Sequence, residues 1–195
     1  MRVLITCGPT WVPIDRVRVI SNRSTGEMGH ALAKAFLKRK AHVTLLEGPM
    51  AFDELKSVLK KEVQKGHDVV IHAAAVSDFK LKTPLKGKIS SRKPLVLKLT
   101  PTPKIIALIK KWSPRTFLVG FKLEPGLTRS RVRRLTQELF RMGCDLVVAN
   151  TVDNGYKGFI VDADGHILAQ ASSKEKIAKS LASVIPECFC RESRH

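Results

Sequence analysis

Two stretches near the start of the chain contain the residue types that hold phosphate groups. Gly8-Pro9-Thr10 ends a short apolar run, and residues 21–29 lead directly into a helical pattern. Amides at a helix N-terminus are unpaired, and glycine lets an anion approach the backbone closely. The spacing matches neither the dinucleotide fingerprint nor the P-loop. We therefore expect residues 8–29 to bind phosphate, although Gly26 and Gly29 could equally be packing glycines and Ser24 a helix cap.

A second group of candidates follows a fully apolar run. Ala73-Ala74-Ala75 leaves room for a flat base or a sugar, and Asp78 comes three residues later. Ligands of open α/β sheets bind at the carboxyl ends of the strands, where these residues are expected. Asp78 could hold a ribose, an exocyclic amine or a metal ion, or could simply cap a turn. His72, within the run, is typical of a core histidine.

A third group is basic and lies in a Lys-, Gly- and Ser-rich stretch. Lys86, Lys88, Arg92 and Lys93 could form a lid over a triphosphate, and ordinary solvated lysines would have the same pattern. The histidines have no metal-ligand spacing. Residues 162–165 lack the Glu that completes a calcium loop, so they are interpreted as a turn.

The whole chain has 195 residues and a net charge of +18. Such a charge is typical of an ordinary solvated basic surface, of a protein that takes phosphorylated substrates, or of a nucleic-acid-binding protein. One Tyr and two Trp make a single-strand binding platform a weak alternative. No apolar run approaches the roughly 20 residues of a membrane span. The first residues have the pattern of a strand and not of a signal peptide. We expect a cytoplasmic protein that does not bind membranes.

The elements that must position these residues alternate along the chain. The patterns predict a single domain over residues 1–195 with an α/β fold, a Rossmann-like, doubly wound, mostly parallel sheet. A hairpin-like flap is expected over about 84–99, with a strand at 95–99, and a C-terminal hairpin around Asp164-Gly165. Strands are predicted over residues 3–7, 41–46, 68–75, 117–121 and 145–149, and helices over 29–39, 55–66, 102–109, 129–142 and 173–184.

Taken together, these segments resemble the phosphopantothenate–cysteine ligase family in its standalone form, because no decarboxylase domain precedes them. The resemblance is spread over the chain, and its most specific part is the Pro-Ile-Asp, Ile-Ser-Asn, Ser-Thr-Gly and Met-Gly series. The matching runs cover residues 5–10, 13–26, 28–29, 73–79, 87–89, 102–105, 119–121 with Glu124, and 145–150.

The resemblance implies a reaction of coenzyme A biosynthesis. The carboxylate of 4′-phosphopantothenate attacks the α-phosphate of CTP or ATP, and the amine of L-cysteine then displaces the nucleotide. It also implies a homodimer whose dimerising flap is the 84–99 stretch, and Mg²⁺ as the cofactor, tentatively on Asp78. The implied catalytic residues are Asn22, Lys88 and Arg18. The residues implied to contact the nucleotide are Gly8, Ala74, Ala75, Asp78, Lys88, Thr102, Pro103, Lys104, Ile105 and Phe121. The residues implied to contact phosphopantothenate or the intermediate are Asn22, Ser24, Gly26, Met28 and Gly29.

The chain departs from the family pattern at three places, which leave the choice between CTP and ATP open. A strand expected after Pro49 is missing, Ser90-Ser91 follow Lys88-Ile89, and Glu138 and Met142 stand where lysines are expected. Arg133, Arg134 or Arg141 could substitute for those lysines. Two alternatives are a degenerate homologue and a basic nucleic-acid-binding module. A third is a Rossmann-like NAD(P)-dependent reductase, which the missing glycine fingerprint disfavours.

Overall fold

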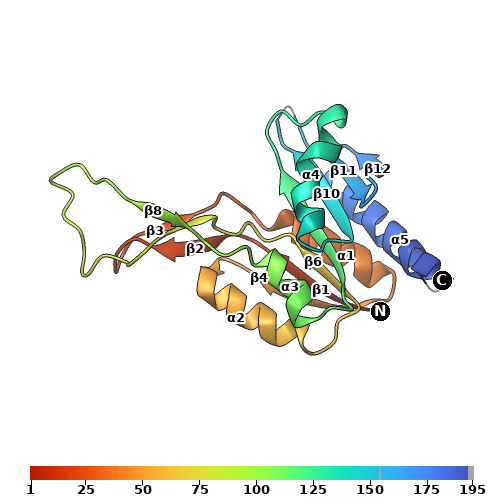
Figure 1. Cartoon of the computed structure of the whole chain (residues 1–195), viewed down its shortest axis with the longest axis horizontal. Helices are drawn as coiled ribbons and strands as arrows, with labels where there is room; N and C mark the ends of the chain where they lie inside the picture. The colour runs from red at the N-terminus through yellow and green to blue at the C-terminus, as the bar shows by residue number, and fades with distance from the viewer. Residues whose placement is uncertain (154, 193–195) are drawn as a thin grey trace.

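The computed structural model describes residues 1–153 and 155–192, with side chains described up to residue 186. Its centre is a seven-stranded sheet in the order β12-β11-β10-β9-β6-β1-β4 (Figure 1). Its parallel part consists of β4 (His42–Glu47), β1 (Arg2–Cys7), β6 (Val69–His72), β9 (Phe117–Leu123) and β10 (Leu146–Thr151). β11 (Lys157–Asp162) and β12 (Ile167–Ala171) extend it as an antiparallel hairpin. The predicted fold class and the C-terminal hairpin are confirmed.

Helices cover both faces of this sheet, which explains the unbroken apolar runs of its central strands. α1 (Glu27–Lys38) and α5 (Lys174–Glu192) pack on one face around Ile5, Ile71 and Val148. α2 (Phe52–Val63), α3 (Ile106–Trp112) and α4 (Val132–Arg141) lie on the other, with a short 3₁₀ turn, η1 (Arg129–Arg131), before α4. Among the described residues, no helix is long and apolar enough to cross a membrane.

The order of the parallel strands places a topological switch point between β1 and β6. From β1 the chain moves outward to β4, and it then returns past β1 to continue through β6, β9 and β10. At such a point the connections leave the sheet in opposite directions and open a crevice at the carboxyl ends of the strands. Cys7 and His72 end the two strands that flank this crevice.

A narrow arm extends from the body, to the left in Figure 1. It contains a three-stranded sheet of β3 (Val19–Ser21), β2 (Thr10–Pro13) and β5 (Met50–Ala51), and a two-stranded sheet of β7 (Phe79–Leu81) and β8 (Leu99–Pro101). Two expectations were wrong here. A two-residue strand does follow Pro49, although it joins the arm and not the main sheet. The strand predicted at 95–99 lies at 99–101 instead, because Leu81 pairs with Leu99 and Phe79 with Pro101.

The third helix begins later than predicted. The amide of Thr102 donates to the carbonyl of Asp78 and its hydroxyl donates to the carbonyl of Ser77, at 2.9 and 2.7 Å. These bonds hold residue 102 against the segment after β6 and continue the pairing of β7 with β8. The chain therefore turns into α3 only at Ile106, and residues 102–105 form an ordered loop at the end of the crevice.

Candidate active site

A cavity of about 970 Å³ occupies the crevice at the carboxyl ends of the parallel strands. Cys7 of β1, Phe121 of β9 and Asn150 of β10 lie at its base, together with the residues that follow β6. Loops and helix ends form its walls, and they bring together parts of the chain that are far apart in sequence. The wall segments are residues 21–29, 72–76, 102–106, 121–123 and parts of α4 and α5.

Most of the predicted site residues line this cavity. They are Asn22, Ser24, Gly26, Met28, Gly29, Ala74, Ala75, Asp78, Thr102, Pro103, Lys104, Ile105 and Phe121. Gly8, Arg18 and Lys88 are not among its lining residues. The proposed lysine substitutes Arg133, Arg134 and Arg141 are not among its lining residues either.

The segment from Gly8 to Gly29 is not one continuous cradle, because the arm strands β2 and β3 interrupt it. A side chain at Gly29 would place its Cβ 2.1 Å from the Cβ of Cys7, so this glycine allows α1 to pack closely on β1. Gly26 precedes α1 in a left-handed conformation with φ of 75°, and α1 begins without a side-chain cap. The packing interpretation of Gly29 is therefore confirmed, whereas phosphate binding at the start of α1 stays a prediction.

Asn22 comes directly after β3, at the junction between the arm and the cavity. Its Nδ2 donates to the carbonyl of Val76 at 2.9 Å and so ties the loop before α1 to the loop after β6. Asn22 is thus not a helix cap. The same loop after β6 is held from the other side by Thr10, whose hydroxyl accepts from the amide of Ser77 at 2.8 Å.

The ionisable groups of the cavity are mostly paired or buried. Lys104 Nζ contacts Asp78 Oδ1 at 2.7 Å, and Lys174 pairs with Glu27 across the ends of α5 and α1. His72 is buried, and burial lowers its pKa to about 4, so that the ring is neutral at physiological pH. Its Nδ1 lies 2.8 Å from the hydroxyl of Thr6, which agrees with the core interpretation of this histidine.

Burial also raises the pKa of the Cys7 thiol to about 11, with a further contribution from Glu47. The thiol is therefore protonated at physiological pH and is a poor nucleophile. Neither His72 nor Cys7 has the titration behaviour of a general base or a nucleophile, so the cavity is equipped for binding and charge neutralisation.

Arg18 and Lys88 lie on the arm, next to each other but outside the cavity. Arg18 Nη1 contacts Asp15 Oδ2 at 2.9 Å and donates to the carbonyl of Ile89 at 3.1 Å. The Asp15 carboxylate also accepts from the amide of Ile89 at 3.0 Å. This amide, those of Val17 and Arg18 and the Arg18 guanidinium hold the pKa of Asp15 down at about 2. We call this group, Asp15 with Arg18 and Ile89, the arm clasp.

Several lining residues were not predicted as site residues. Asn150 stands at the carboxyl end of a parallel strand, so the position rule for open sheets could have found it. Lys174 had no such signal, because it reaches the cavity only through the packing of α5 on α1. Tyr156 lies in the segment between β10 and β11, and Glu27 stands between the predicted Gly26 and Met28. Burial raises the pKa of Tyr156, whose hydroxyl finds no hydrogen-bond partner among the described residues.

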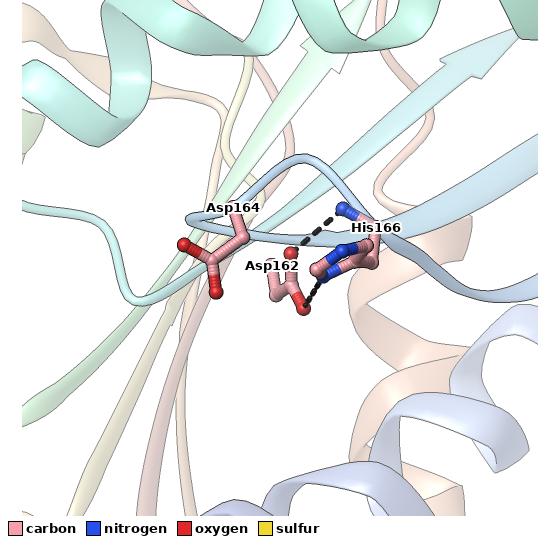
Figure 2. A group of neighbouring side chains, drawn as sticks. All are labelled: Asp162, Asp164 and His166. Atoms are coloured by element: carbon pink, nitrogen blue, oxygen red, sulfur yellow. Dashed lines mark hydrogen bonds and ion pairs between the residues drawn. The ribbon is translucent and has the colours of Figure 1, made fainter.

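The hairpin turn between β11 and β12 holds the one group of metal-type ligands among the described residues, Asp162, Asp164 and His166. Figure 2 shows that both carboxylate oxygens of Asp162 already face His166, accepting from its amide at 2.8 Å and meeting its Nδ1 at 3.2 Å. These contacts close the turn between the two strands, as predicted for this stretch, and none of the three residues lines the cavity.

Comparisons with known proteins agree with this architecture. Residues 1–187 match the family model described as DNA/pantothenate metabolism flavoprotein C-terminal domain. The chain is 42% identical over 166 residues to the coenzyme A biosynthesis bifunctional protein CoaBC of Thermococcus kodakarensis, covering 77% of this chain and 41% of that protein. It is 31% identical to the CoaBC protein of Escherichia coli K12, over 89% of this chain and 47% of that protein. The chain thus spans about half the length of these curated relatives.

Solved structures show the same fold over nearly the whole chain. The DNA/pantothenate metabolism flavoprotein of Streptococcus pneumoniae superposes with a TM-score of 0.83 at 28% identity, over 96% of this chain and 99% of that one. A complex of Cab2 with phosphopantothenate-cysteine shares the fold with a TM-score of 0.75 at 22% identity, over 99% and 86%. The chain therefore belongs to the DNA/pantothenate metabolism flavoprotein C-terminal domain family, the family of phosphopantothenate–cysteine ligases that its motifs resemble.

Proposed function

We propose that this chain joins 4′-phosphopantothenate to L-cysteine through an acyl-nucleotide formed from CTP or ATP. The observation that carries the proposal is the cavity at the switch point, which unites residues 21–29, 73–76 and 102–105 with Asp78 and Phe121. A volume of about 970 Å³ is at the upper end of small-molecule sites and accommodates a nucleotide beside a second substrate. The CoaBC relatives are coenzyme A biosynthesis proteins, and the Cab2 neighbour was solved with the product of such a reaction.

The reaction has two displacements. In the first, a carboxylate oxygen of 4′-phosphopantothenate forms a bond to the α-phosphorus, and the bond between that phosphorus and the bridging oxygen breaks to release pyrophosphate. In the second, the cysteine amine forms the amide bond at the acyl carbon, the nucleoside monophosphate leaves with the electron pair, and the amine gives up one proton. Both steps bring anions together, so neutralising charge and holding the substrates in line account for most of the catalysis.

The residues of the cavity can supply that neutralisation. The N-terminus of α1 lines the cavity beside Ser24 and Gly26, so the positive end of the helix dipole favours an anion there. Lys104 and Lys174 add positive charges to the lining of the cavity, and each can turn from its carboxylate partner to a phosphate. Asn22 lines the cavity and is fixed through Val76, and we assign its amide oxygen and backbone to the acyl group.

Asp78 fits the magnesium ion expected with a nucleoside triphosphate. Its carboxylate lines the cavity, is 58% exposed, and has only Lys104 as an ionic partner among the described residues. Magnesium in such sites is held by one or two carboxylates together with the substrate phosphates and water, so a lone exposed Asp is sufficient. When bound, Mg²⁺ would neutralise charge on the phosphates. The role of Asp78 would be to hold the ion, and with it the phosphates, in one orientation in the cavity.

A homodimer would give Arg18 and Lys88 a place in catalysis. Both residues belong to the arm and neither lines the cavity of its own chain. The arm also carries most of the exposed large apolar side chains of the described residues: Val17, Val19, Phe79, Leu85, Leu95, Val96 and Leu99. Apolar surface of this kind favours a second copy of the chain. We propose that two arms pair, and that Lys88 and Arg18 complete the cavity of the partner.

The proposed function is tested by pyrophosphate release with 4′-phosphopantothenate, with and without L-cysteine, with CTP and ATP in parallel. We expect release that depends on phosphopantothenate, and formation of phosphopantothenoylcysteine only when cysteine is present. If neither nucleotide supports pyrophosphate release, the protein is a degenerate homologue. Oxidation of NAD(P)H by the protein would instead favour the reductase alternative.

A further inference from the structure

A second cavity, of about 580 Å³, lies between the C-terminal hairpin and α5. α5 runs beside β11 and β12 here (Figure 1), and none of the residues that line this cavity lines the one at the switch point. Every polar side chain of its lining can donate a hydrogen bond, and no carboxylate of the described residues belongs to it. We call it the hairpin cavity. Its polar lining residues are Lys157, Gln170, Ser172, Lys176, Lys179 and Ser180.

Close packing fixes the walls of the hairpin cavity. A side chain at Gly158 would place its Cβ 2.7 Å from Ile177 Cγ1, so α5 packs tightly on β11 at this point. Lys157 and Lys176 are the neighbours of these two residues in sequence, and the contact therefore holds their backbones close together. Because Ile177 is fully buried, the strand and the helix cannot separate here without opening the core.

Three ammonium groups share the hairpin cavity. Lys176 and Lys179 are about one helical turn apart and lie on one face of α5, and Lys157 joins them from β11. The carboxylate of Glu175, next to Lys176 in sequence, is exposed and does not line the cavity. A single exposed lysine is simply solvated by water. Three lysines around one concave surface repel one another, however, and an anion inside it attracts all three at once.

The neutral groups of the hairpin cavity favour the same kind of ligand. Arg129 Nη1 donates to Gln170 Oε1 at 3.2 Å, which leaves the Nε2 of Gln170 available as a donor. Ser172 lies just before α5, where the positive end of the helix dipole adds to the charge of the lysines. Phosphate groups carry several strong acceptor oxygens, so this set of donors suits them.

We propose that the hairpin cavity binds an oligophosphate, that is, a linear di- or triphosphate group. One phosphate carries a charge of about −1.5 to −2, so two or three linked phosphates match three ammonium groups better. Its described lining contains no aromatic side chain on which the bases of a nucleic acid could stack. The inference goes beyond the proposed function and does not depend on it, because this cavity is separate from the one at the switch point. Free pyrophosphate and the triphosphate of a nucleotide are two sources of the same chemistry.

The experiment counts binding sites for inorganic triphosphate by isothermal titration calorimetry at low salt. The test variant carries Lys157→Gln, Lys176→Gln and Lys179→Gln together. We expect it to lose one site per chain relative to the wild type, or to bind at that site at least about tenfold more weakly, the combined effect of three exposed ion pairs. The three lysines are exposed, so the variant should unfold in urea like the wild type. Parallel titrations with pyrophosphate, CTP and ATP show which source of oligophosphate the site accepts.

The matched control carries Lys34→Gln, Lys60→Gln and Lys61→Gln, which remove the same charge from exposed positions of α1 and α2 outside both cavities. It should bind as many triphosphates as the wild type. Identical titrations of the wild type and the test variant would overturn the inference. Equal losses in the test variant and the control would overturn it too, because binding would then follow the net charge of +18.

A nucleic-acid site is a further outcome that would overturn the inference. A single-stranded oligonucleotide would then bind more tightly than triphosphate, and the test variant would lose that binding. The ligase function and the hairpin cavity can also fail separately. Loss of one triphosphate site in the test variant supports the inference even if the wild type releases no pyrophosphate from CTP or ATP.

Discussion

Asn22 connects the two loops that form the centre of the cavity, and its role depends on the chemistry of its amide. Nδ2 donates to the carbonyl of Val76 at 2.9 Å, which fixes the side chain at the end of β3. Asn22→Asp replaces this donor by a carboxylate, which repels both the carbonyl and anionic substrates. We expect the cysteine step to slow more than activation, so that the acyl-nucleotide accumulates in a single turnover, as measured by rapid quench.

Gln137→Glu is a suitable control, because it adds the same charge to an exposed position of α4 that does not line the cavity. It should turn over like the wild type. Conversion of substrates to product by Asn22→Asp without any accumulated acyl-nucleotide would contradict this role for Asn22.

At the scale of elements, the contact between α1 and β1 depends on the absence of a side chain at Gly29. A Cβ there would lie 2.1 Å from the Cβ of Cys7, closer than any real contact, so Gly29→Ala forces α1 away from the sheet. Overpacking of this kind costs about 1–3 kcal/mol of unfolding free energy, which urea denaturation measures. Lys34→Ala on the exposed side of the same helix should have little effect. Equal stability of Gly29→Ala and the wild type would refute this account of α1 packing.

The arm clasp predicts a pH dependence of stability. Asp15 has a folded-state pKa of about 2, below its usual value of 3.8. Its contribution to the free energy of unfolding is therefore complete when the pH is above 3.8, and it is lost as the pH falls through about 2. Asp15→Asn lacks that contribution at every pH. The wild type should therefore resist denaturant better than the variant at pH 6, and the difference should shrink between about pH 4 and pH 2. A difference that stays constant over this range would exclude Asp15 as its source.

The two kinds of element were not equally predictable from the sequence. β1, β6 and β10 could be predicted because strands buried on both faces are continuous apolar runs bounded by turns. β2, β3, β5 and β7 are two to four residues long and only partly buried, so they have neither alternation nor an apolar run. Their pairing is set by contacts between distant segments, such as Thr10 with Met50.

The same distinction applies to the site. Ala74, Asp78 and Phe121 follow or end predicted strands, so the topology of a parallel sheet brings them together. The contact of Lys174 with Glu27 joins residues that are 147 positions apart and depends on how α5 packs on α1. Sequence periodicity contains no information about that packing. Likewise, Lys88 falls within the predicted flap, but the pattern that singled out Arg18 could not show that this residue belongs to the same arm.

For the molecule as a whole, the high positive charge has a kinetic consequence. A net charge of +18 attracts anionic substrates over distances comparable with the Debye length, about 8 Å at physiological salt. We expect the KM for the nucleoside triphosphate to rise with KCl concentration while kcat changes little. A KM independent of salt would indicate that only the charges within the cavity matter, and tight, salt-dependent binding to DNA would favour the nucleic-acid alternative.

The position of Lys88 on the arm gives a decisive test of the proposed dimer. Lys88→Gln should lose pyrophosphate release while keeping its fold, as circular dichroism would verify. Asn22→Asp should be slow for a different reason, because Asn22 lines the cavity of its own chain. If Lys88 completes the cavity of the partner, a mixed dimer of the two variants contains one site with both substitutions and one site with neither.

Random exchange makes half of the dimers mixed, so unfolding and refolding the two variants together should restore about a quarter of the wild-type activity. Each variant refolded alone should keep its own low rate of product formation. If Lys88 instead folds back over its own cavity, every site in the mixture keeps one defect, and the mixture should form product no faster than the average of the two variants. Recovery of activity would thus assign the arm to the neighbouring site, and its absence would require the arm to move within one chain.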